Sequence, residues 1–394
     1  MASRRLPAAV ERDLHACLQC GYCNFVCPIQ LNPGLGWESY RVRGKMYHLR
    51  RYAHPGLLER IAGDRAKISP EFVERVYNCT ACGYCQVACH VEIKFNDRWE
   101  ELKEWFVENG IGPLERHKAL RSRVIAKRNP YDEPHERRAD WIPRSHHKPK
   151  HPEVLFFAGC TASYRQQKIA VDTLRVLDAA GVEYDILGTD EWCCGSPLIR
   201  TGQTDIVVDE ADGLVKHNLW EIEKRGIDTV VTACAGCFMT LSHNYPMYAG
   251  MHDFKLYHMT QFIDRLISQK KLTLKKPLAG RVAYHDPCHI GRHFGIFEEP
   301  RRVLKAFPES RYLEMPRNRL DSLCCGAGGG FKIQFNDRAE HIASLRVEEA
   351  KSVGADMLVS ACPFCVTNLS HGARRAGIDM PVAEMVSLVA DSVS

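Results

Sequence analysis

All eighteen cysteines of the 394-residue chain belong to four motif sets. Two sets have ferredoxin-type spacing, and the other two contain five cysteines each. The sets are Cys17-x2-Cys20-x2-Cys23-x3-Cys27-Pro28; Cys79-x2-Cys82-x2-Cys85-x3-Cys89; Cys160, Cys193-Cys194-Gly195 and Cys234-x2-Cys237; and Cys288, Cys324-Cys325-Gly326 and Cys362-x2-Cys365. The fold has to bring thiolates from distant parts of the chain together. This pattern predicts iron–sulfur clusters and electron transfer.

The composition is that of an ordinary globular protein, with 45% hydrophobic and 26% charged residues. The net charge of +5 is too small to indicate nucleic-acid binding, and we expect no nucleic-acid partner. We see no signal peptide, because Glu11-Arg12-Asp13 interrupts the N-terminal segment before an apolar core develops. No apolar run approaches the roughly 18 residues of a membrane-spanning helix. We therefore expect a reducing, cytoplasmic location, with any membrane contact made through a partner subunit.

Each ferredoxin-type run predicts three ligands to one cubane [4Fe–4S] cluster and a fourth ligand to the other cluster. A Cys-x2-Cys-x2-Cys loop wraps three irons, whereas the cysteine three residues later points away from them. Structural zinc sites typically use two separated pairs of ligands, so zinc is the weaker interpretation. The predicted ligands are Cys17, Cys20, Cys23 and Cys89 for the first cubane cluster, and Cys79, Cys82, Cys85 and Cys27 for the second.

The N-terminal part of the chain predicts a helical domain followed by a connector. Residues 1–110 contain both ferredoxin-type runs. An apolar stripe predicts an amphipathic helix over 96–109, and the stretches 55–66 and 70–77 also favour helix. Residues 111–152 form a basic, proline-rich connector. We interpret the connector as a solvated linker rather than a docking strip for a partner subunit.

From residue 153 onward, one unit occurs twice at an offset of about 130 residues. The two copies are residues 153–279 and 280–394. Each copy alternates three strands with helices, which predicts parallel sheets with the cysteines at the carboxyl ends of strands. The predicted fold class is therefore α+β: a helical ferredoxin-like N-terminal domain followed by two pseudo-twofold-related α/β cysteine-rich domains.

Five thiolates per repeat are one more than a cubane cluster needs. Adjacent cysteines also diverge unless a turn reorients them, and Gly195 and Gly326 permit such a turn. Each five-cysteine set must therefore use its fifth sulfur or place two neighbouring thiolates so that they bridge irons.

The repeated Cys…Cys-Cys-Gly…Cys-x2-Cys unit resembles the cysteine-rich domain of heterodisulfide reductase B and D subunits and their relatives. Both ferredoxin-type runs precede both units, which is similar to the D subunit, a fusion of C and B subunits. The segments 38–45, 129–136 and 141–143 also match. The resemblance implies one noncubane [4Fe–4S] cluster per repeat. The implied ligands are Cys160, Cys193, Cys194, Cys234 and Cys237 for the first, and Cys288, Cys324, Cys325, Cys362 and Cys365 for the second.

The same resemblance implies an oxidoreductase subunit that passes electrons between two ferredoxin-type clusters and two noncubane clusters. No side chain is assigned a catalytic role. His285 and His289, near Cys288, are candidate proton donors, although ordinary packing or exposure is the favoured interpretation. The glycines of 326–330 lack the Lys-Ser/Thr of a phosphate loop, and we read this segment as a close backbone approach to a cluster. Because no Gly-x-Gly-x-x-Gly fingerprint is present, we expect this chain to bind neither flavin nor NAD.

Three roles remain open, because all of them require the same ligands. The chain is a catalytic reductase of a disulfide such as that of coenzymes M and B, a relay in a flavin-based bifurcating complex such as a benzoyl-CoA reductase, or a quinone- or cytochrome-coupled subunit. The last class includes respiratory complexes and the glycolate, lactate and glycerol-3-phosphate oxidases. In each case the expected partner is another subunit of a redox complex, either an A-type flavoprotein or a membrane cytochrome b or quinone-interacting subunit.

Overall fold

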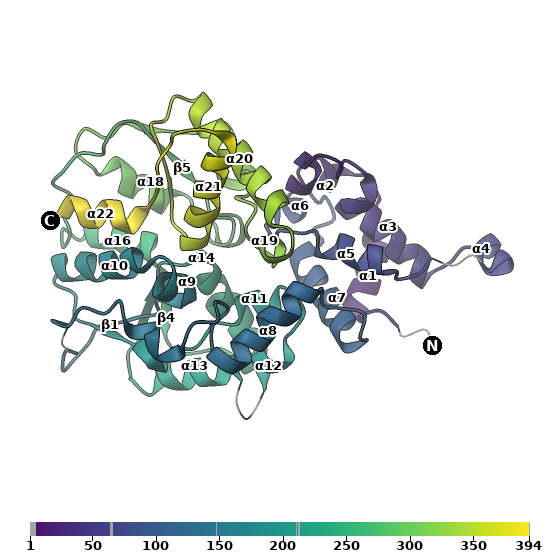
Figure 1. The fold of residues 1–394 in the computed structure, drawn as a ribbon, viewed down its shortest axis with the longest axis horizontal. Helices are drawn as coiled ribbons and strands as arrows, with labels where there is room; N and C mark the ends of the chain where they lie inside the picture. Colours follow the sequence, from purple (N-terminus) through teal and green to yellow (C-terminus); the bar gives the residue numbers. More distant parts are fainter. Residues whose placement is uncertain (1–4, 64–65, 147, 210, 212, 394) are drawn as a thin grey trace. The chain divides into compact units, whose positions relative to one another are not determined.

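The computed structural model describes residues 5–63, 66–146, 148–209, 211 and 213–393 (Figure 1). The chain forms two compact units, and each is built from several segments of the sequence. Unit 1 contains Met1–Ala119, Pro197–Thr204 and Gly326–Ile342, and unit 2 contains Leu120–Ser196, Asp205–Cys325 and Ala343–Ser394. We call Pro197–Thr204 insert 1 and Gly326–Ile342 insert 2. Each insert begins at, or just after, the glycine of a Cys-Cys-Gly motif.

Two of the helices predicted for the N-terminal domain are present in unit 1 with nearly the expected bounds. The apolar stripe over 96–109 forms α7 (Phe95–Glu108), which turns its tryptophans and leucine into the core. The stretch 70–77 forms α5 (Pro70–Tyr77). Ser69 caps α5 by accepting a hydrogen bond from the backbone N–H of Phe72, and proline occupies the first helical position, where its missing N–H costs nothing.

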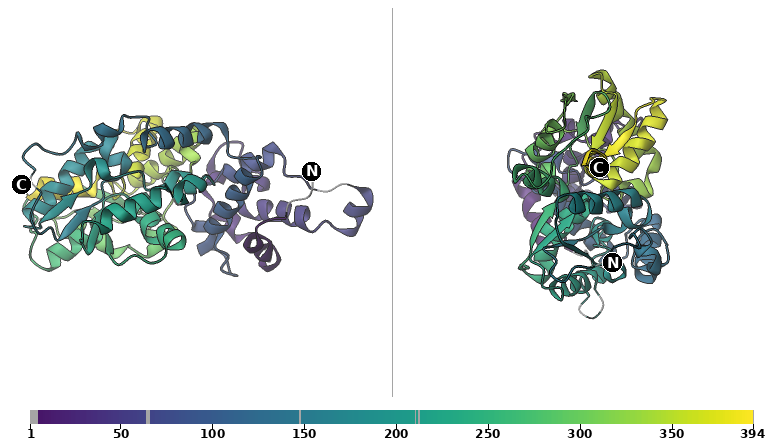
Figure 2. Two further views of the ribbon diagram at one scale, coloured as in Figure 1. Left: turned by 90° about the horizontal axis from the view of Figure 1, so that it is seen from below. Right: turned by 90° about the vertical axis from the view of Figure 1, so that its left-hand side faces the viewer.

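The helix predicted over 55–66 is shorter in the structure. It forms α4 (Leu57–Ala62) and ends at Gly63, whose φ of +69° is a left-handed helix stop. Residues 64 and 65 lie outside the described residues. In Figures 1 and 2, α4 lies at the tip of an excursion from unit 1 that follows α3 (Val42–Ala53). The other elements of unit 1 are α1 (Ala8–Ala16), α2 (Tyr22–Phe25), η1 (Pro28–Leu31), η2 (Glu38–Tyr40), α6 (Tyr84–Val87) and α19 (Phe331–Gln334).

Both inserts are fixed inside unit 1 by close backbone contacts at a glycine. Gly202 has a φ of +78°, and a Cβ added there would lie 2.3 Å from the carbonyl carbon of Lys103. Gly329 has a φ of +67°, and its added Cβ would lie 2.4 Å from the carbonyl oxygen of Cys79. Lys103 also donates a hydrogen bond from Nζ to the carbonyl oxygen of Arg200, at 3.0 Å. Only glycine permits these approaches, and insert 2 consequently lies against the start of the second ferredoxin-type run.

Unit 2 contains one four-stranded sheet from each repeat, and the strand order is the same in both: β2-β1-β3-β4 and β6-β5-β7-β8. Every neighbouring pair is parallel. The predicted α/β domains with parallel sheets are confirmed, whereas the fourth strand of each sheet was not predicted. The strands are β1 (Val154–Phe156), β2 (Tyr184–Ile186), β3 (Thr229–Thr232), β4 (Lys255–His258), β5 (Val282–His285), β6 (Tyr312–Leu313), β7 (Met357–Ser360) and β8 (Val382–Glu384).

Helices and turns connect these strands and cover the sheets. Three helices, α8 (Glu115–Lys127), α11 (Ser196–Ile199) and α20 (Asn336–Ser352), include three of the five points where the chain passes from one unit to the other. The other elements of unit 2 are η3 (His135–Ala139), α9 (Gly159–Tyr164), α10 (Gln167–Ala179), η4 (Gly188–Asp190), α12 (Asp205–Val208), α13 (Leu214–Glu223), α14 (Ala235–Met239), the π-helical η5 (Thr240–Asn244), α15 (Tyr245–Ala249), α16 (Met259–Ser268), α17 (Gly291–Phe294), α18 (Glu298–Lys305), η6 (Arg319–Asp321), α21 (Pro363–Ala376) and α22 (Met385–Val393).

The two repeats pack against each other reciprocally. Helix α10 of the first repeat contacts α22 of the second, and α16 of the first contacts α18 of the second. Each contact carries an ion pair in the equivalent place: Arg175 with Asp391 at 3.0 Å, and Arg302 with Asp264 at 2.6 Å. A pseudo-twofold relation requires this exchange of equivalent residues.

The boundaries predicted between sequence domains, at 110/111, 152/153 and 279/280, remain our proposal, because the compact units interleave segments from several of these domains. Among the described residues, the structure has no helix that is both long and apolar enough to cross a membrane.

Replacing Gly202 with alanine should destabilise unit 1 by about 3 kcal/mol, since the new Cβ would overlap the backbone of Lys103 in addition to straining a left-handed residue. Gly110→Ala is the matched control in the same unit. Gly110 has a similar φ of +69° but nothing within 4 Å of the added Cβ, so it should lose only about 1–2 kcal/mol. Urea unfolding of both variants measures the difference, and equal losses would contradict the close contact.

Candidate functional site

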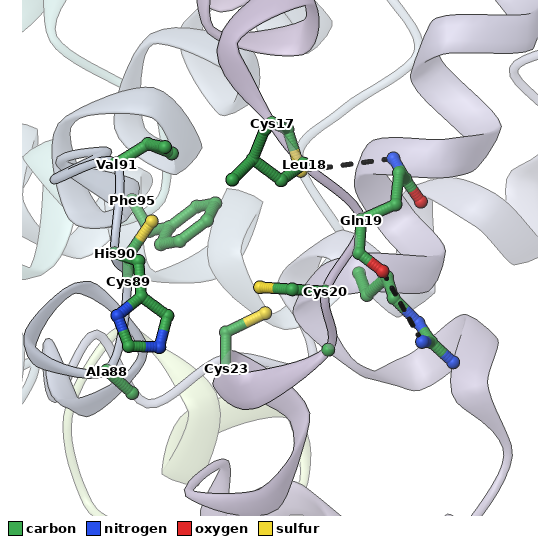
Figure 3. A pocket seen from close by; sticks show the side chains of 12 residues that line it. Cys17, Leu18, Gln19, Cys20, Cys23, Ala88, Cys89, His90, Val91 and Phe95 are labelled. Carbon is green, nitrogen blue, oxygen red and sulfur yellow. Dashed lines mark hydrogen bonds between the residues drawn. The ribbon is translucent and has the colours of Figure 1, made fainter.

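The thiols of Cys17, Cys20, Cys23 and Cys89 line one pocket of unit 1 (Figure 3). In Figure 3 their sulfur atoms point into a common space, although Cys89 comes from the other ferredoxin-type run. Burial, followed by the like charges of the other three thiols, raises the pKa of Cys23 to about 12. Four thiolates that oppose one another's ionisation need a shared positive group to stay together, and the irons of a cluster would supply it.

The fourth cysteine of the first run lies among the thiols of the second run. Burial raises the pKa of Cys27 to about 12, and the charges of Cys79 and Cys82 act in the same direction. Burial also raises the pKa of Cys85, and the next three contributions come from Cys82, Cys79 and Cys27. The structure thus brings together the four residues that the spacing assigns to the second cubane cluster.

A buried lysine adjoins this second group of thiols, and the sequence analysis gave it no role. Lys45 is 2% exposed, and its Nζ donates a hydrogen bond to the carbonyl oxygen of Asn78 at 3.1 Å. Burial lowers its pKa, whereas the nearby thiolates of Cys79, Cys27 and Cys85 raise it. Burying an ammonium group away from a countercharge costs several kcal/mol. The thiolates are therefore the anionic group that this lysine faces.

Eight thiols of the two five-cysteine sets form one continuous row in unit 2. Each thiol in the row is hydrogen-bonded to the next, and Sγ of Cys325 lies 3.2 Å from Sγ of Cys365. Cys324 is buried beside Cys325 in the chain, and Cys288 is half-buried. The row runs in the order Cys160, Cys193, Cys194, Cys237, Cys234, Cys362, Cys365 and Cys325.

The two sets meet where the third strand of each sheet ends. Cys234 follows β3 and caps α14, and Cys362 follows β7 and caps α21. Their side chains are hydrogen-bonded to each other, so one residue of each repeat joins the two halves of the row. Gly195 and Gly326 have φ values of +85° and +84°, which turn the paired cysteines as the sequence indicates. The pseudo-twofold relation therefore places the two five-cysteine sets in contact.

The connector supplies a buried arginine to the first set, so its interpretation as a solvated linker is wrong at this residue. Arg138, in η3, and Glu191 have side chains that are each 1% exposed and form an ion pair. Both terminal nitrogens of Arg138 donate to Sγ of Cys160 at 3.6 Å. Glu191 also accepts the backbone N–H groups of Ala158 and Gly159, at 2.7 and 2.8 Å. The ion pair offsets part of the desolvation cost of burying this basic residue.

The signals for Arg138 and Glu191 were weak in the sequence. Arg138 lies between two segments that match the heterodisulfide reductase family, and it was counted only as part of a charge run. Glu191 occupies the position that Ser322 occupies in the second repeat, so a charged residue replaces an uncharged one within an otherwise repeated motif. Departures from the repeat were therefore the most useful signal for residues that act at one set alone.

The two candidate histidines have different surroundings in the second repeat. His285 is buried, and a ring nitrogen of His285 and the sulfurs of Cys325 and Cys365 all lie within 4.8 Å of one another. Nε of Arg346 donates to its Nδ1 at 3.2 Å, which leaves the ring proton on Nε2. Burial lowers the pKa of His285 to about 3, so at neutral pH it is a neutral N–H donor. The ring of His289 packs 5.7 Å from that of His293.

Comparison with known proteins agrees with these two groups of motifs. The model of the cysteine-rich domain matches residues 154–242 and 282–370, and that of the 4Fe-4S dicluster domain matches 13–93. Over 400 residues the chain is 38% identical to the D subunit of the dihydromethanophenazine:CoB–CoM heterodisulfide reductase of Methanosarcina barkeri, covering 99% of this chain and 97% of the relative. The chain belongs to the family of heterodisulfide reductase D subunits.

Two further comparisons extend this result. The B subunit of a fumarate reductase (CoM/CoB) from Methanothermobacter marburgensis is 31% identical, over 96% of this chain and 72% of the relative. The crystal structure of a hypothetical protein from Helicobacter pylori covers 99% of this chain and 73% of its own length, with a TM-score of 0.59 at 10% identity, and it shares the fold. This member of the D-subunit family is an iron–sulfur oxidoreductase subunit, and its relatives belong to multi-subunit reductases.

Proposed function

We propose that the chain is the iron–sulfur electron-transfer subunit of a heterodisulfide-reductase-like complex. It passes electrons between two cubane [4Fe–4S] clusters, held by the two ferredoxin-type groups of thiols, and two noncubane [4Fe–4S] clusters, held by the two five-cysteine sets. The observation that carries the proposal is the row of thiols that joins both sets at Cys234 and Cys362. Two redox centres in such contact can act on one substrate or exchange electrons directly.

The first ferredoxin-type group is the better placed to exchange electrons with a partner subunit. Cys20 is exposed, whereas Cys82 and Cys85 of the second group are buried. Three large apolar side chains of the same run are also exposed: Leu18 by 68%, Tyr22 by 56% and Phe25 by 78%. Apolar residues gathered at an exposed redox site are typical of a docking surface. We assign this face to the electron-donating or electron-accepting subunit of the complex.

The second ferredoxin-type group contacts insert 2, which follows the second five-cysteine set in the chain. Gly329 of insert 2 lies against the backbone at Cys79, and Cys325 directly precedes Gly326, where insert 2 begins. The buried charge of Lys45 favours an anionic cluster at this group. We infer that electrons from the partner reach the five-cysteine sets through this second cluster.

A second candidate function, reduction of a disulfide, is favoured by the contact between the two five-cysteine sets. Reduction consumes two electrons and two protons and yields two thiols, and the clusters, when bound, would supply the electrons one at a time. The residues of this chain would hold one substrate sulfur near each set, so that neither sulfur leaves as a free radical. The heterodisulfide of coenzymes M and B is the substrate that the relative from Methanosarcina barkeri is named for.

Four clusters predict about sixteen iron atoms and sixteen acid-labile sulfides per chain. Variants compared in pairs test whether the fourth cysteine of each ferredoxin-type run binds the cluster of the other run. Cys89→Ser should alter the same paramagnetic signal as Cys20→Ser, and Cys27→Ser the same signal as Cys82→Ser, because each pair belongs to one cluster. Iron analysis and electron paramagnetic resonance of the reduced holoprotein measure both. About eight irons per chain would exclude the noncubane clusters. If Cys89→Ser instead altered the same signal as Cys82→Ser, and Cys27→Ser the same signal as Cys20→Ser, the exchange of fourth ligands between the two runs would be excluded.

Disulfide reduction predicts that the reduced holoprotein releases two thiols from each heterodisulfide of coenzymes M and B. A thiol assay after anaerobic mixing measures them. The oxidised protein should also give a new paramagnetic signal when coenzyme M is added, since a substrate sulfur would bind at a five-cysteine set. Cys234→Ser, with its cubane clusters intact, is the control and should release none. If the wild-type protein neither releases thiols nor gives a signal, the chain is a relay only.

Phe25→Glu should slow reduction by the co-purifying partner subunit about tenfold, since a charge in the centre of an apolar contact is costly. Reduction by dithionite should be unchanged, because this small reagent needs no docking surface. Met251→Glu alters an equally exposed apolar residue in unit 2 and should have no effect. Equal rates for Phe25→Glu and wild type would place the docking surface elsewhere.

The identity of that partner distinguishes the remaining roles. An A-type flavoprotein would indicate a bifurcating complex, alone or with a degradative reductase such as benzoyl-CoA reductase. A membrane cytochrome b or quinone-interacting subunit would indicate a respiratory role or an oxidase of glycolate, lactate or glycerol 3-phosphate, with membrane association through that partner. Purification of the native complex and identification of its subunits decides between them.

A further inference from the structure

Arg138 places a buried cation in direct contact with one thiol of the first five-cysteine set. Its guanidinium is enclosed, with both terminal nitrogens on Sγ of Cys160. Glu191 and the carbonyl oxygen of Trp192, at 3.5 Å, accept further hydrogen bonds from the same group. Because Glu191 is itself fixed by the backbone N–H groups of Ala158 and Gly159, the guanidinium is held in one orientation toward the thiol.

The sequence repeat does not copy this arrangement. Arg138 precedes the first repeat in the sequence, so duplication of the unit does not copy it, and Ser322 stands where Glu191 stands. In the second repeat, the buried side chain of Arg346 pairs with Glu349 at 2.8 Å. Arg346 donates to Nδ1 of His285 at 3.2 Å, and it is the histidine ring that adjoins the thiols. Arg138 thus reaches the thiol of Cys160 from outside the repeated unit.

A charged hydrogen-bond donor on a ligand thiolate stabilises the electron-rich state of the group that the thiolate holds. Hydrogen bonds to the sulfurs and net charge are two of the properties that set the potential of an iron–sulfur cluster. Burial strengthens both effects, since water does not screen the charge. The contact of Arg138 with Cys160 must therefore raise the potential of the group that this thiolate holds.

We propose that Arg138 is a positioning residue that raises the reduction potential of the cluster held by the Cys160 set above the value that its five cysteines alone would give. This inference rests on the proposed noncubane cluster at that set. The connector thus supplies a charge at the first set that the duplicated cysteine motif does not encode.

The test is an anaerobic redox titration of the full-length holoprotein, followed by electron paramagnetic resonance. The signal of the first set is identified as the one lost in Cys160→Ser. In Arg138→Gln, the ratio of reduced to oxidised cluster at a fixed potential should fall about tenfold for this signal alone, which corresponds to 59 mV for a one-electron couple. Arg138→Lys keeps the charge with a single ammonium in place of the two-pronged contact, and should restore part of the shift.

Arg137→Gln is the matched control, because Arg137 is the preceding residue in η3 and its exposed side chain pairs with Glu133 and Asp140. It should leave every potential unchanged. An unshifted potential in Arg138→Gln with full iron content would overturn the inference and leave the proposed clusters intact. About eight irons in the wild type would instead remove the clusters themselves. Loss of the cluster in both Arg138 variants would also overturn the inference, since it would make Arg138 only a structural support for Cys160.

Discussion

The contact between Cys234 and Cys362 is the constraint on which the rest of unit 2 depends. Each residue ends the third strand of its sheet and caps the following helix, so their meeting requires the two sheets to face each other through the same edge. The exchanged helix pairs α10 with α22 and α16 with α18 maintain that relation, and their ion pairs recur at equivalent residues. Ten thiolates repel one another, and this packing holds them close until irons neutralise the charge.

Arg138 and Glu191 are not duplicated by the internal repeat, because Arg138 precedes the first copy and Ser322 stands where Glu191 stands. A buried ion pair contributes little net stability, because desolvation offsets most of the attraction. The desolvation cost of this ion pair is accounted for if Arg138 acts on the thiol of Cys160 that it contacts. Lys45 is a comparable case in unit 1, because its buried ammonium group faces thiolates rather than a carboxylate. In both places a basic residue that is ordinary in the sequence becomes part of a metal site once it is enclosed.

The local sequence predicted the structure well where it carried a periodic apolar pattern or a cysteine motif. The amphipathic stripe over 96–109 formed α7, and the apolar runs that precede Cys160, Cys234, Cys288 and Cys362 formed parallel strands. It was a poor guide where burial depended on distant residues. The short strands β4 and β8 carry too little apolar pattern to stand out, and helix α4 ended early at a glycine. The connector was misjudged at Arg138 because its charge gives no hint that Glu191 will enclose it.

The cysteine spacing by itself determined the iron–sulfur chemistry and the likeness between the two halves, because thiolates at such intervals have few other uses. Only the tertiary structure decided which sets touch, which thiols are exposed and which charges are buried beside them. Inserts 1 and 2 show the reason: Gly202 and Gly329 allow backbones far apart in the sequence to approach within contact distance. Such proximity is a property of tertiary packing. The repeat in the sequence does not encode which of its two copies Arg138 will contact.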